Sequence, residues 1–158
     1  EEINRILIDD LSDFFFVTEQ SGVDHLKKEG KEEKKIYFVG NTMIDSLVNY
    51  KEFVKKSKIL AKINCPEEYG LMTFHRPSNV DNSKTLNELV NTIELCCSKL
   101  TMVITLHPRT KKSLIKHNLW ERFKRIKNLI FTDSLGYLDF MKLVSNSKIV
   151  ITDSGGLQ

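Results

Sequence analysis

Short apolar segments alternate with amphipathic helical segments along most of the chain, and this alternation limits the fold more than any other feature. Extended segments are expected at residues 14–18, 36–39, 71–74, 102–106, 129–132 and 148–152. Between them, apolar residues recur at helical intervals, most clearly at Leu86, Leu89, Val90, Ile93 and Cys97. Nearly continuous apolar strands that alternate with helices are typical of a parallel sheet covered on both faces. The sequence therefore predicts an α/β protein.

The same pattern locates the helices and their ends. Helices are predicted at residues 21–28, 42–63, 83–100, 109–125 and 137–146, and the first residues already follow a helical rhythm. Gly30 is expected to end the helix 21–28, and Asn118 to interrupt the segment 109–125. The run Phe14-Phe15-Phe16 is predicted to be a buried strand. Because the chain opens within a helical pattern and closes on a turn, we expect a fragment of a longer protein.

Composition excludes several classes of protein. The 24 Lys and Arg residues exceed the 21 Asp and Glu residues by only three, and acidic residues interleave with the lysines of segment 27–35. Such interleaving is typical of a solvated surface and argues against a nucleic-acid partner. The apolar runs are far shorter than the roughly 18 residues that a membrane span requires. The three cysteines form a poor disulfide framework and favour a reducing cytoplasm, and no zinc-binding spacing occurs.

Polar motifs follow each of the last four predicted strands. They are His75-Arg76-Pro77-Ser78-Asn79, His107-Pro108-Arg109, Asp133-Ser134 and Asp153-Ser154-Gly155-Gly156. In open parallel sheets, ligands bind outside the carboxyl ends of the strands. The four loops are therefore expected to meet along one edge of the sheet and to form one crevice.

The residue types in these loops suit an anionic ligand, although each has a simpler interpretation. A histidine can transfer a proton near neutral pH, and an arginine can hold a phosphate through two hydrogen bonds. Glycines after a strand let backbone N–H groups approach an anion, but Ser154-Gly155-Gly156 can also be an ordinary turn. His75 and His107 can be structural. Tyr137 and Phe140 follow the pattern of core residues, although one aromatic ring can stack on a base.

Taken in order, these motifs resemble the non-hydrolysing UDP-N-acetylglucosamine 2-epimerases. The matching segments are Glu1 to Arg5, Thr18-Glu19, Leu26 to Gly30, Val39 to Asp45, Thr73 to Asn82, His107-Pro108, Tyr137 to Phe140 and Thr152 to Gln158. The resemblance implies a GT-B fold, in which two Rossmann-like domains face each other. It divides the chain into the end of the N-terminal domain (1–40), a crossover helix region (41–65) and a truncated C-terminal UDP-binding domain (66–158).

The resemblance also implies an activity, namely the interconversion of UDP-GlcNAc and UDP-ManNAc for surface polysaccharides. UDP is eliminated to leave a 2-acetamidoglucal and is then added back, without a cofactor or a metal. Catalysis is assigned to Glu1, as a carboxylate that takes part in the proton transfers, and to His75, which contacts the diphosphate and assists the departure of UDP. UDP binding is assigned to His75, Leu135, Phe140, Ser154, Gly155 and Gly156, with Leu135 touching the base through its backbone. Arg76 and His107 match positions linked in some members to a second, regulatory UDP-GlcNAc.

Some features of this sequence depart from the family pattern or leave alternatives open. Ser78 stands where many members carry Glu, which leaves open the contacts of its loop and any regulatory site there. The chain also lacks the N-terminal region that carries two further acidic residues in the family, and it stops before an expected Glu-Glu pair, so the chain alone is predicted to be inactive. The alternatives are an epimerase of a UDP-diacetamido-uronic acid, a hydrolysing epimerase, a GT-B glycosyltransferase and a nucleotide-binding module without activity. A UDP-sugar is the expected partner, without nucleic acid or membrane, and the family implies a cytoplasmic homodimer.

Overall fold

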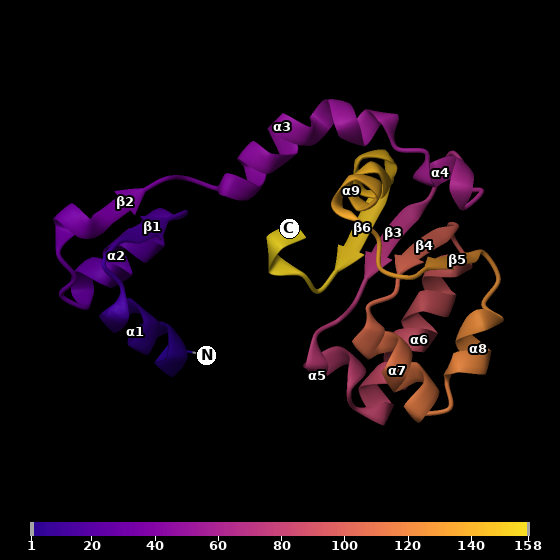
Figure 1. The fold of residues 1–158 in the computed structure, drawn as a ribbon. Helices are drawn as coiled ribbons and strands as arrows, with labels where there is room; N and C mark the ends of the chain where they lie inside the picture. Colours follow the sequence, from indigo (N-terminus) through magenta and orange to yellow (C-terminus); the bar gives the residue numbers. More distant parts are fainter. Residues whose placement is uncertain (1, 158) are drawn as a thin grey trace. The chain divides into compact units, whose positions relative to one another are not determined.

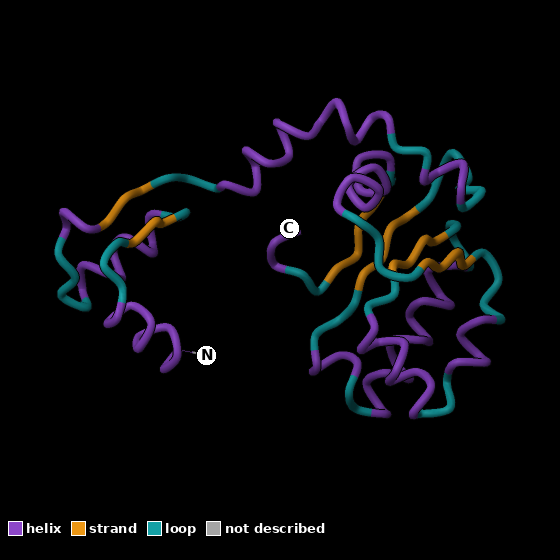
Figure 2. The backbone as a smooth tube through the Cα atoms, in the orientation of Figure 1, coloured by secondary structure: helices purple, strands orange, loops and turns teal. Residues whose placement is uncertain are grey.

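The computed structural model describes residues 2–157. The chain folds as two compact units, Glu1–Lys51 and Glu52–Gln158, which are described separately below (Figures 1 and 2). Both units contain parallel strands and helices, as the alternation in the sequence predicts. The predicted domain boundaries at residues 40 and 65 stay predictions.

The first unit contains a parallel pair of strands. Its elements are α1 (Glu2–Leu11), β1 (Phe15–Val17), α2 (Gln20–Lys28), a 3-10 turn (Glu33–Lys35) and β2 (Ile36–Phe38), followed by the start of α3 (Thr42–Lys56). The register pairs Phe15 with Ile36 and Val17 with Phe38. As predicted, α2 ends just before Gly30, which adopts a left-handed φ of 80°.

The predicted burial of the Phe14–Phe16 run is only partly right. Phe15 is buried, but Phe14 is 59% exposed and Phe16 is 71% exposed. Successive side chains of a strand point to opposite faces, and only one face of this two-stranded sheet is covered, by Val23 and Leu26 of α2. Burial of the whole run needs cover on both faces.

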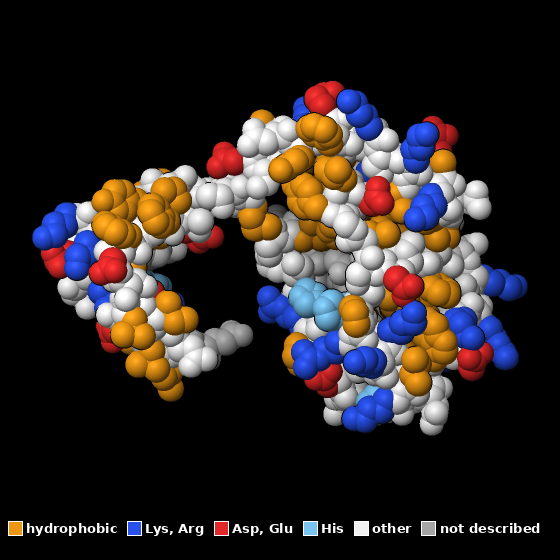
Figure 3. All heavy atoms as spheres, viewed as in Figure 1, with side chains coloured by type: hydrophobic (Ala, Val, Ile, Leu, Met, Phe, Trp, Pro, Cys, Tyr) orange, Lys and Arg blue, Asp and Glu red, His pale blue; other side chains and the backbone are white. Residues whose placement is uncertain are grey.

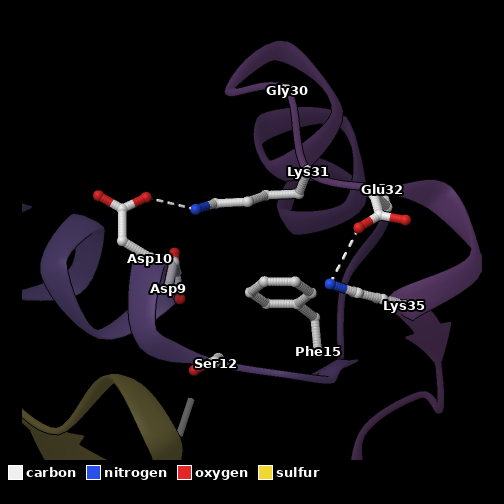
Figure 4. Close-up of a pocket in the computed structure, with 8 residues that line it drawn as sticks. All are labelled: Asp9, Asp10, Ser12, Phe15, Gly30, Lys31, Glu32 and Lys35. Carbon is white, nitrogen blue, oxygen red and sulfur yellow. Dashed lines mark hydrogen bonds and ion pairs between the residues drawn. The ribbon is translucent and has the colours of Figure 1, made fainter.

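A small pocket in the first unit is lined by paired charges. Lys31 crosses the Phe15 ring, with its Nζ 6.0 Å from the ring centroid, and pairs with Asp10 (Figure 4). Lys35 Nζ lies 2.9 Å from the Glu32 carboxylate on the other side of the ring. These lysines are neutralised by their neighbours, so the pocket offers no free charge from them to an anion.

The second unit is built around a four-stranded parallel sheet in the order β5-β4-β3-β6. The strands are β3 (Gly70–Thr73), β4 (Met102–Thr105), β5 (Leu129–Thr132) and β6 (Ile149–Thr152). The helices are α4 (Ile59–Lys62), α5 (Pro77–Val80), α6 (Ser83–Cys97), α7 (Pro108–Lys116), α8 (Trp120–Lys124) and α9 (Tyr137–Asn146), and a 3-10 turn spans Gly155–Leu157.

Helices cover both faces of this sheet, as predicted. On one face, Met72 and Ile104 pack with residues of α5, α6, α7 and α8 (Figure 1). On the other face, Leu71 and Val103 pack with Leu143 of α9 and with residues of α4. Because alternate residues of β3 and β4 serve opposite cores, both central strands are buried over almost their whole length.

Two predicted helices are shorter than expected. The predicted helix 42–63 ends at Lys56, because the Ser57 side chain accepts a hydrogen bond from Ile59 N–H and donates one to Asp139. As predicted, the segment 109–125 is interrupted at Asn118, which separates α7 from α8. Asn118 adopts a left-handed φ of 59°. Side-chain hydrogen bonds of this kind compete with a continuous helix.

Two packing details complete the second unit. Gly70 leaves space for Met102 of the neighbouring strand, because a Cβ atom at Gly70 would lie 2.7 Å from the Met102 sulfur. The three cysteines are free, in agreement with the sequence, and burial raises the pKa of the Cys97 thiol to about 11. Among residues 2–157, no helix is long and apolar enough to cross a membrane.

Candidate active site

The strand order of the second unit reverses between β3 and β6. The chain runs from β3 through β4 to β5, and then returns along α9 to place β6 on the other side of β3. Helices α5 and α6, which follow β3, and helix α9, which precedes β6, pack on opposite faces of the sheet. Such a switch point is where open α/β sheets bind their ligands. The loops that carry His75 and Ser154 start at this point, and the sequence predicts both as site residues.

The Asp153 carboxylate joins the two loops. Its side chain is only 7% exposed and accepts hydrogen bonds from the backbone N–H groups of His75 and Arg76, at 3.0 and 2.9 Å. Asn79 Nδ2 donates a further bond of 3.0 Å, and His75 Nδ1 lies 3.0 Å from Asp153 Oδ1. Asp153 thus fixes both the backbone of the loop after β3 and the His75 ring.

These contacts keep Asp153 ionised. Burial alone raises the pKa of a carboxyl group, because it disfavours the charged form. Here the N–H groups of Arg76, Asn79 and His75 outweigh that cost, and they hold the pKa of Asp153 below its ordinary value. A buried anion is therefore maintained directly behind His75.

His107, at the end of β4, lies beside His75. The centroids of the two rings are 5.7 Å apart, and Figure 3 shows exposed histidine side chains next to Lys and Arg side chains. His107 Nδ1 accepts the Arg109 backbone N–H at 3.1 Å and so caps α7. The buried Thr110 hydroxyl donates to the Phe74 carbonyl at 2.5 Å, which ties α7 to the end of β3.

The Ser154-Gly155-Gly156 turn lies next to Arg76. A Cβ atom placed on Gly155 would lie 3.8 Å from Arg76 Nη2. The Ser154 N–H is used within the turn, where it donates to Thr152 Oγ1. Within the described part of the chain, no hydrogen bond takes up the N–H of Gly155 or Gly156, and no carboxylate pairs with the Arg76 guanidinium. This edge therefore offers a free cation and free N–H donors, which together suit a phosphate group.

Within the described part of the chain, no hydrogen bond or ion pair joins Leu135 or Phe140 to this group. Leu135 and Phe140 are partly buried and pack against the core on the α9 face of the sheet. This agrees with the simpler interpretation of Phe140 as a packing residue, although its ring keeps some exposure. Glu1, the predicted catalytic carboxylate, lies outside the described residues.

Three residues that hold the loops of the site in place were not singled out as site residues from the sequence. Asp153 belongs to one of the four polar motifs but has no role of its own in the sequence analysis, whereas its bonds reach the loop after β3. Asn79 and Thr110 were assigned no role, and both fix the loop that carries His75. The position of Asp153 and Asn79 after two strands that prove to be neighbours was the one signal in the sequence for their contact. Among residues 2–157, no cluster of His, Cys, Asp or Glu has the arrangement of a metal site.

Known proteins provide an independent comparison. The whole chain, residues 1–158, matches the UDP-N-acetylglucosamine 2-epimerase family. A UDP-N-acetylglucosamine 2-epimerase of Methanocaldococcus jannaschii is 38% identical over 164 aligned residues, which cover 100% of this chain and 45% of that protein. A UDP-2,3-diacetamido-2,3-dideoxy-D-glucuronate 2-epimerase of Pseudomonas aeruginosa is 35% identical over 100% of this chain and 43% of its own length.

Solved structures agree with the sequence comparison. The crystal structure of the M. jannaschii UDP-GlcNAc 2-epimerase in complex with UDP-GlcNAc and UDP has a TM-score of 0.88 and 36% identity, over 99% of this chain and 44% of that one. The chain spans less than half the length of these relatives. The predicted GT-B class is confirmed, since the parallel α/β units match structures of that class. The chain thus belongs to the UDP-N-acetylglucosamine 2-epimerase family.

Proposed function

We propose that the whole protein interconverts UDP-GlcNAc and UDP-ManNAc as a non-hydrolysing 2-epimerase and so supplies surface polysaccharide synthesis. The observation that carries the proposal is the meeting of His75, Arg76 and the Gly155 turn at the switch point of the sheet. The relatives named as UDP-GlcNAc 2-epimerases support the same substrate. The reaction is carried by the protein's own side chains and backbone.

Elimination needs a base at C2 and a stabilised leaving group. The base takes the C2 proton while the C1–O bond breaks, and the electron pair of that bond passes to the diphosphate oxygen. Arg76 and the N–H groups of Gly155 and Gly156 hold the diphosphate, and His75 hands a proton to the leaving oxygen. UDP then bonds again to C1, and a proton delivered to C2 from the opposite face of the glucal completes the inversion at C2. Glu1 is our candidate for a carboxylate that takes part in the proton transfers.

The remaining predicted residues complete the proposed UDP site. Phe140 packs on uracil through its exposed edge, the Leu135 backbone contacts the base, and Ser154 orders the diphosphate turn. Arg76 and His107 are also candidates for a second, regulatory UDP-GlcNAc, and Ser78 alters that part of the loop. The M. jannaschii relative has been crystallised in complex with both UDP-GlcNAc and UDP.

Calorimetric titration with UDP tests the diphosphate turn in the whole protein. A branched side chain at Gly155 projects toward Arg76 and obstructs the approach of a phosphate to the backbone. Gly155→Val is expected to weaken UDP binding at least about tenfold, which corresponds to ~1.4 kcal/mol. Gly155→Ala is the graded control and should weaken binding less. Equal affinity in all three proteins contradicts the proposed phosphate site.

Product analysis by NMR separates the reactions. UDP-ManNAc as the main product supports the non-hydrolysing epimerase, whereas free ManNAc with UDP identifies the hydrolysing reaction. Transfer of the sugar to an acceptor identifies a glycosyltransferase, and tight UDP binding without turnover identifies a binding module. Glu1→Gln should lower kcat far more than it raises KM for the epimerase.

A second candidate is epimerisation of a UDP-diacetamido-uronic acid. The Pseudomonas aeruginosa relative with that name is 35% identical to this chain, close to the value for the UDP-GlcNAc epimerases. Competition between the two UDP-sugars for the whole protein decides between them through the ratio of their kcat/KM values.

The proposal extends to assembly and location. We assign the whole protein to the cytoplasm, as a homodimer that uses a soluble UDP-sugar. Light scattering after size-exclusion chromatography tests the dimer, and a monomer at micromolar concentration contradicts it.

A further inference from the structure

Two histidines face each other at the switch point, and each has one ring nitrogen fixed by a different kind of partner. His75 Nδ1 meets the Asp153 carboxylate, whereas His107 Nδ1 meets the backbone N–H of Arg109. An ionised carboxylate can accept hydrogen bonds but cannot donate them, and a backbone N–H can donate a hydrogen bond but cannot accept one. The two partners therefore demand opposite protonation at Nδ1.

His75 must carry a proton on Nδ1, because Asp153 Oδ1 lies 3.0 Å away and can only accept. Its Nε2 is then the atom that gains or loses a proton. The His75 side chain is 41% exposed, whereas the Asp153 side chain is 7% exposed. The buried carboxylate is thus covered by the ring, and the outer nitrogen is left for a ligand.

His107 must be unprotonated at Nδ1, because that atom accepts the Arg109 N–H at 3.1 Å. Its remaining proton lies on Nε2, and the neutral ring can only donate there. Protonation of Nδ1 breaks the cap of α7. His107 is therefore suited to donate a hydrogen bond and unsuited to shuttle a proton.

We propose that Asp153 is a positioning residue that holds the proton of His75 on Nδ1 and leaves Nε2 as the proton-transferring atom, while His107 acts as a neutral hydrogen-bond donor. The catalytic part of this inference rests on the proposed epimerase function. In elimination, Nε2 of the cationic His75 gives its proton to the departing phosphate oxygen, and the ring becomes neutral with Nδ1 still protonated. Re-addition returns that proton to Nε2.

The groups that face His75 come from three loops. Asp153 lies behind it at the end of β6, Arg76 follows it in its own loop, and His107 faces it from the end of β4. Arg109 in α7 is paired with Asp81. The anion next to Nδ1 is therefore Asp153.

Asp153→Asn makes a definite change to this arrangement. Oδ2 of Asp153 accepts three bonds, from His75 N, Arg76 N and Asn79 Nδ2, so an amide oxygen is expected to take that place. The amide NH2 then faces His75 Nδ1 and donates to it. The neutral ring must move its proton to Nε2, and His75 acquires the tautomer of His107.

Long-range ¹H–¹⁵N NMR of the imidazole rings in alkaline buffer tests the inference on the 158-residue chain without substrate. The wild-type protein should show the proton of His75 on Nδ1 and that of His107 on Nε2. Asp153→Asn should move the His75 proton to Nε2, and Asp133→Asn, at the end of β5, should leave it on Nδ1. A wild-type His75 protonated on Nε2, or a His75 tautomer unaffected by Asp153→Asn, overturns the proposal.

The whole protein supplies the second readout. Asp153→Asn is expected to lower kcat about 10- to 100-fold, with KM changed much less, because the ring remains but its acting nitrogen is in the wrong state. An unchanged kcat overturns the positioning role. If the NMR result holds and the wild-type protein makes no epimer, the proposed function fails while the assignment of the two rings stands. If Asp153→Asn does not fold, the wild-type tautomers still decide the assignment.

Discussion

The two units contain similar helices and strands, but they differ greatly in how completely they bury them. In the second unit, Leu71, Val103 and Leu143 are fully inaccessible to solvent, and two cores form on the two faces of the sheet. In the first unit, Leu11 is 87% exposed and Phe16 is 71% exposed. Apolar content alone therefore does not make a core. A parallel sheet must have enough strands, and helices on both faces, before its side chains are covered.

The largest expected difference concerns the cores. Leu86→Ala, in α6 of the second unit, should lower the free energy of unfolding by about 2–5 kcal/mol, because it leaves a cavity among fully buried side chains. The control Leu7→Ala removes a side chain that is 56% exposed in α1 and should cost less than about 0.5 kcal/mol. Urea denaturation of Leu86→Ala is followed by the fluorescence of Trp120, the single tryptophan of the sequence, which lies in the second unit. Urea denaturation of Leu7→Ala is followed by helical circular dichroism, which also reports on α1 of the first unit. Equal losses for the two variants contradict the comparison.

A smaller effect is expected from a single buried hydrogen bond. Thr110→Val keeps the shape of the side chain but leaves the Phe74 carbonyl without its buried donor, at a cost of about 1–3 kcal/mol. Thr92→Val is the matched control, because the Thr92 hydroxyl donates to a carbonyl on the exposed side of α6. Thermal unfolding of both variants measures the difference. A loss for Thr92→Val as large as that for Thr110→Val contradicts the assignment.

Acid should weaken the second unit through Asp153. The pKa of Asp153 is lowered in the folded state, so the folded state binds fewer protons than the unfolded chain. Its contribution to stability is present above the unfolded pKa of about 3.9. That contribution is lost as the pH falls through the lower, folded value. Urea titrations between neutral and acidic pH should show this loss in the wild-type protein, and Asp153→Asn should show a flatter pH dependence. The same slope in both proteins excludes Asp153 as the source.

The smallest effect is expected at the Arg5 cluster on the first unit. Arg5 pairs with Glu2, Asp9 and Glu29, and these contacts lower the pKa of Glu2 and of Glu29. The cluster is open to solvent, so salt screens it. Arg5→Ala should reduce helical circular dichroism slightly at low salt. In 1 M salt, where the Debye length is about 3 Å, the variant should match the wild-type protein. A difference that persists in high salt shows that packing, not charge, is involved.

The main elements of the fold follow from the sequence because apolar periodicity is local. The six strands and the long helix α6 were predicted close to their observed positions. The breaks in helices were harder to predict. The interruption at Asn118 was predicted from the local sequence, whereas the break at Ser57 depends on Asp139, 82 positions away. Helix α5, with four residues, is too short to show a period.

The site could be predicted as a set of residues but not as an arrangement. His75, Arg76, Ser154 and Gly155 were found because each follows a strand of one parallel sheet. The bond between Asp153 and the backbone of the loop after β3 depends on which strands are neighbours, and the sequence does not specify that order. The tautomers of His75 and His107 follow only from such contacts.

Because Gly70 and Met102 lie so close together, the residues at these two positions of neighbouring strands are expected to change together during evolution. A side chain at position 70 can be accepted only if the residue at position 102 becomes shorter or turns away, because the flexible end of Met102 fills the available volume. A mutation to alanine at one position and a compensating change at the other should therefore arise together during evolution. Homologues that keep glycine at the start of this strand remain free to keep a long side chain beside it.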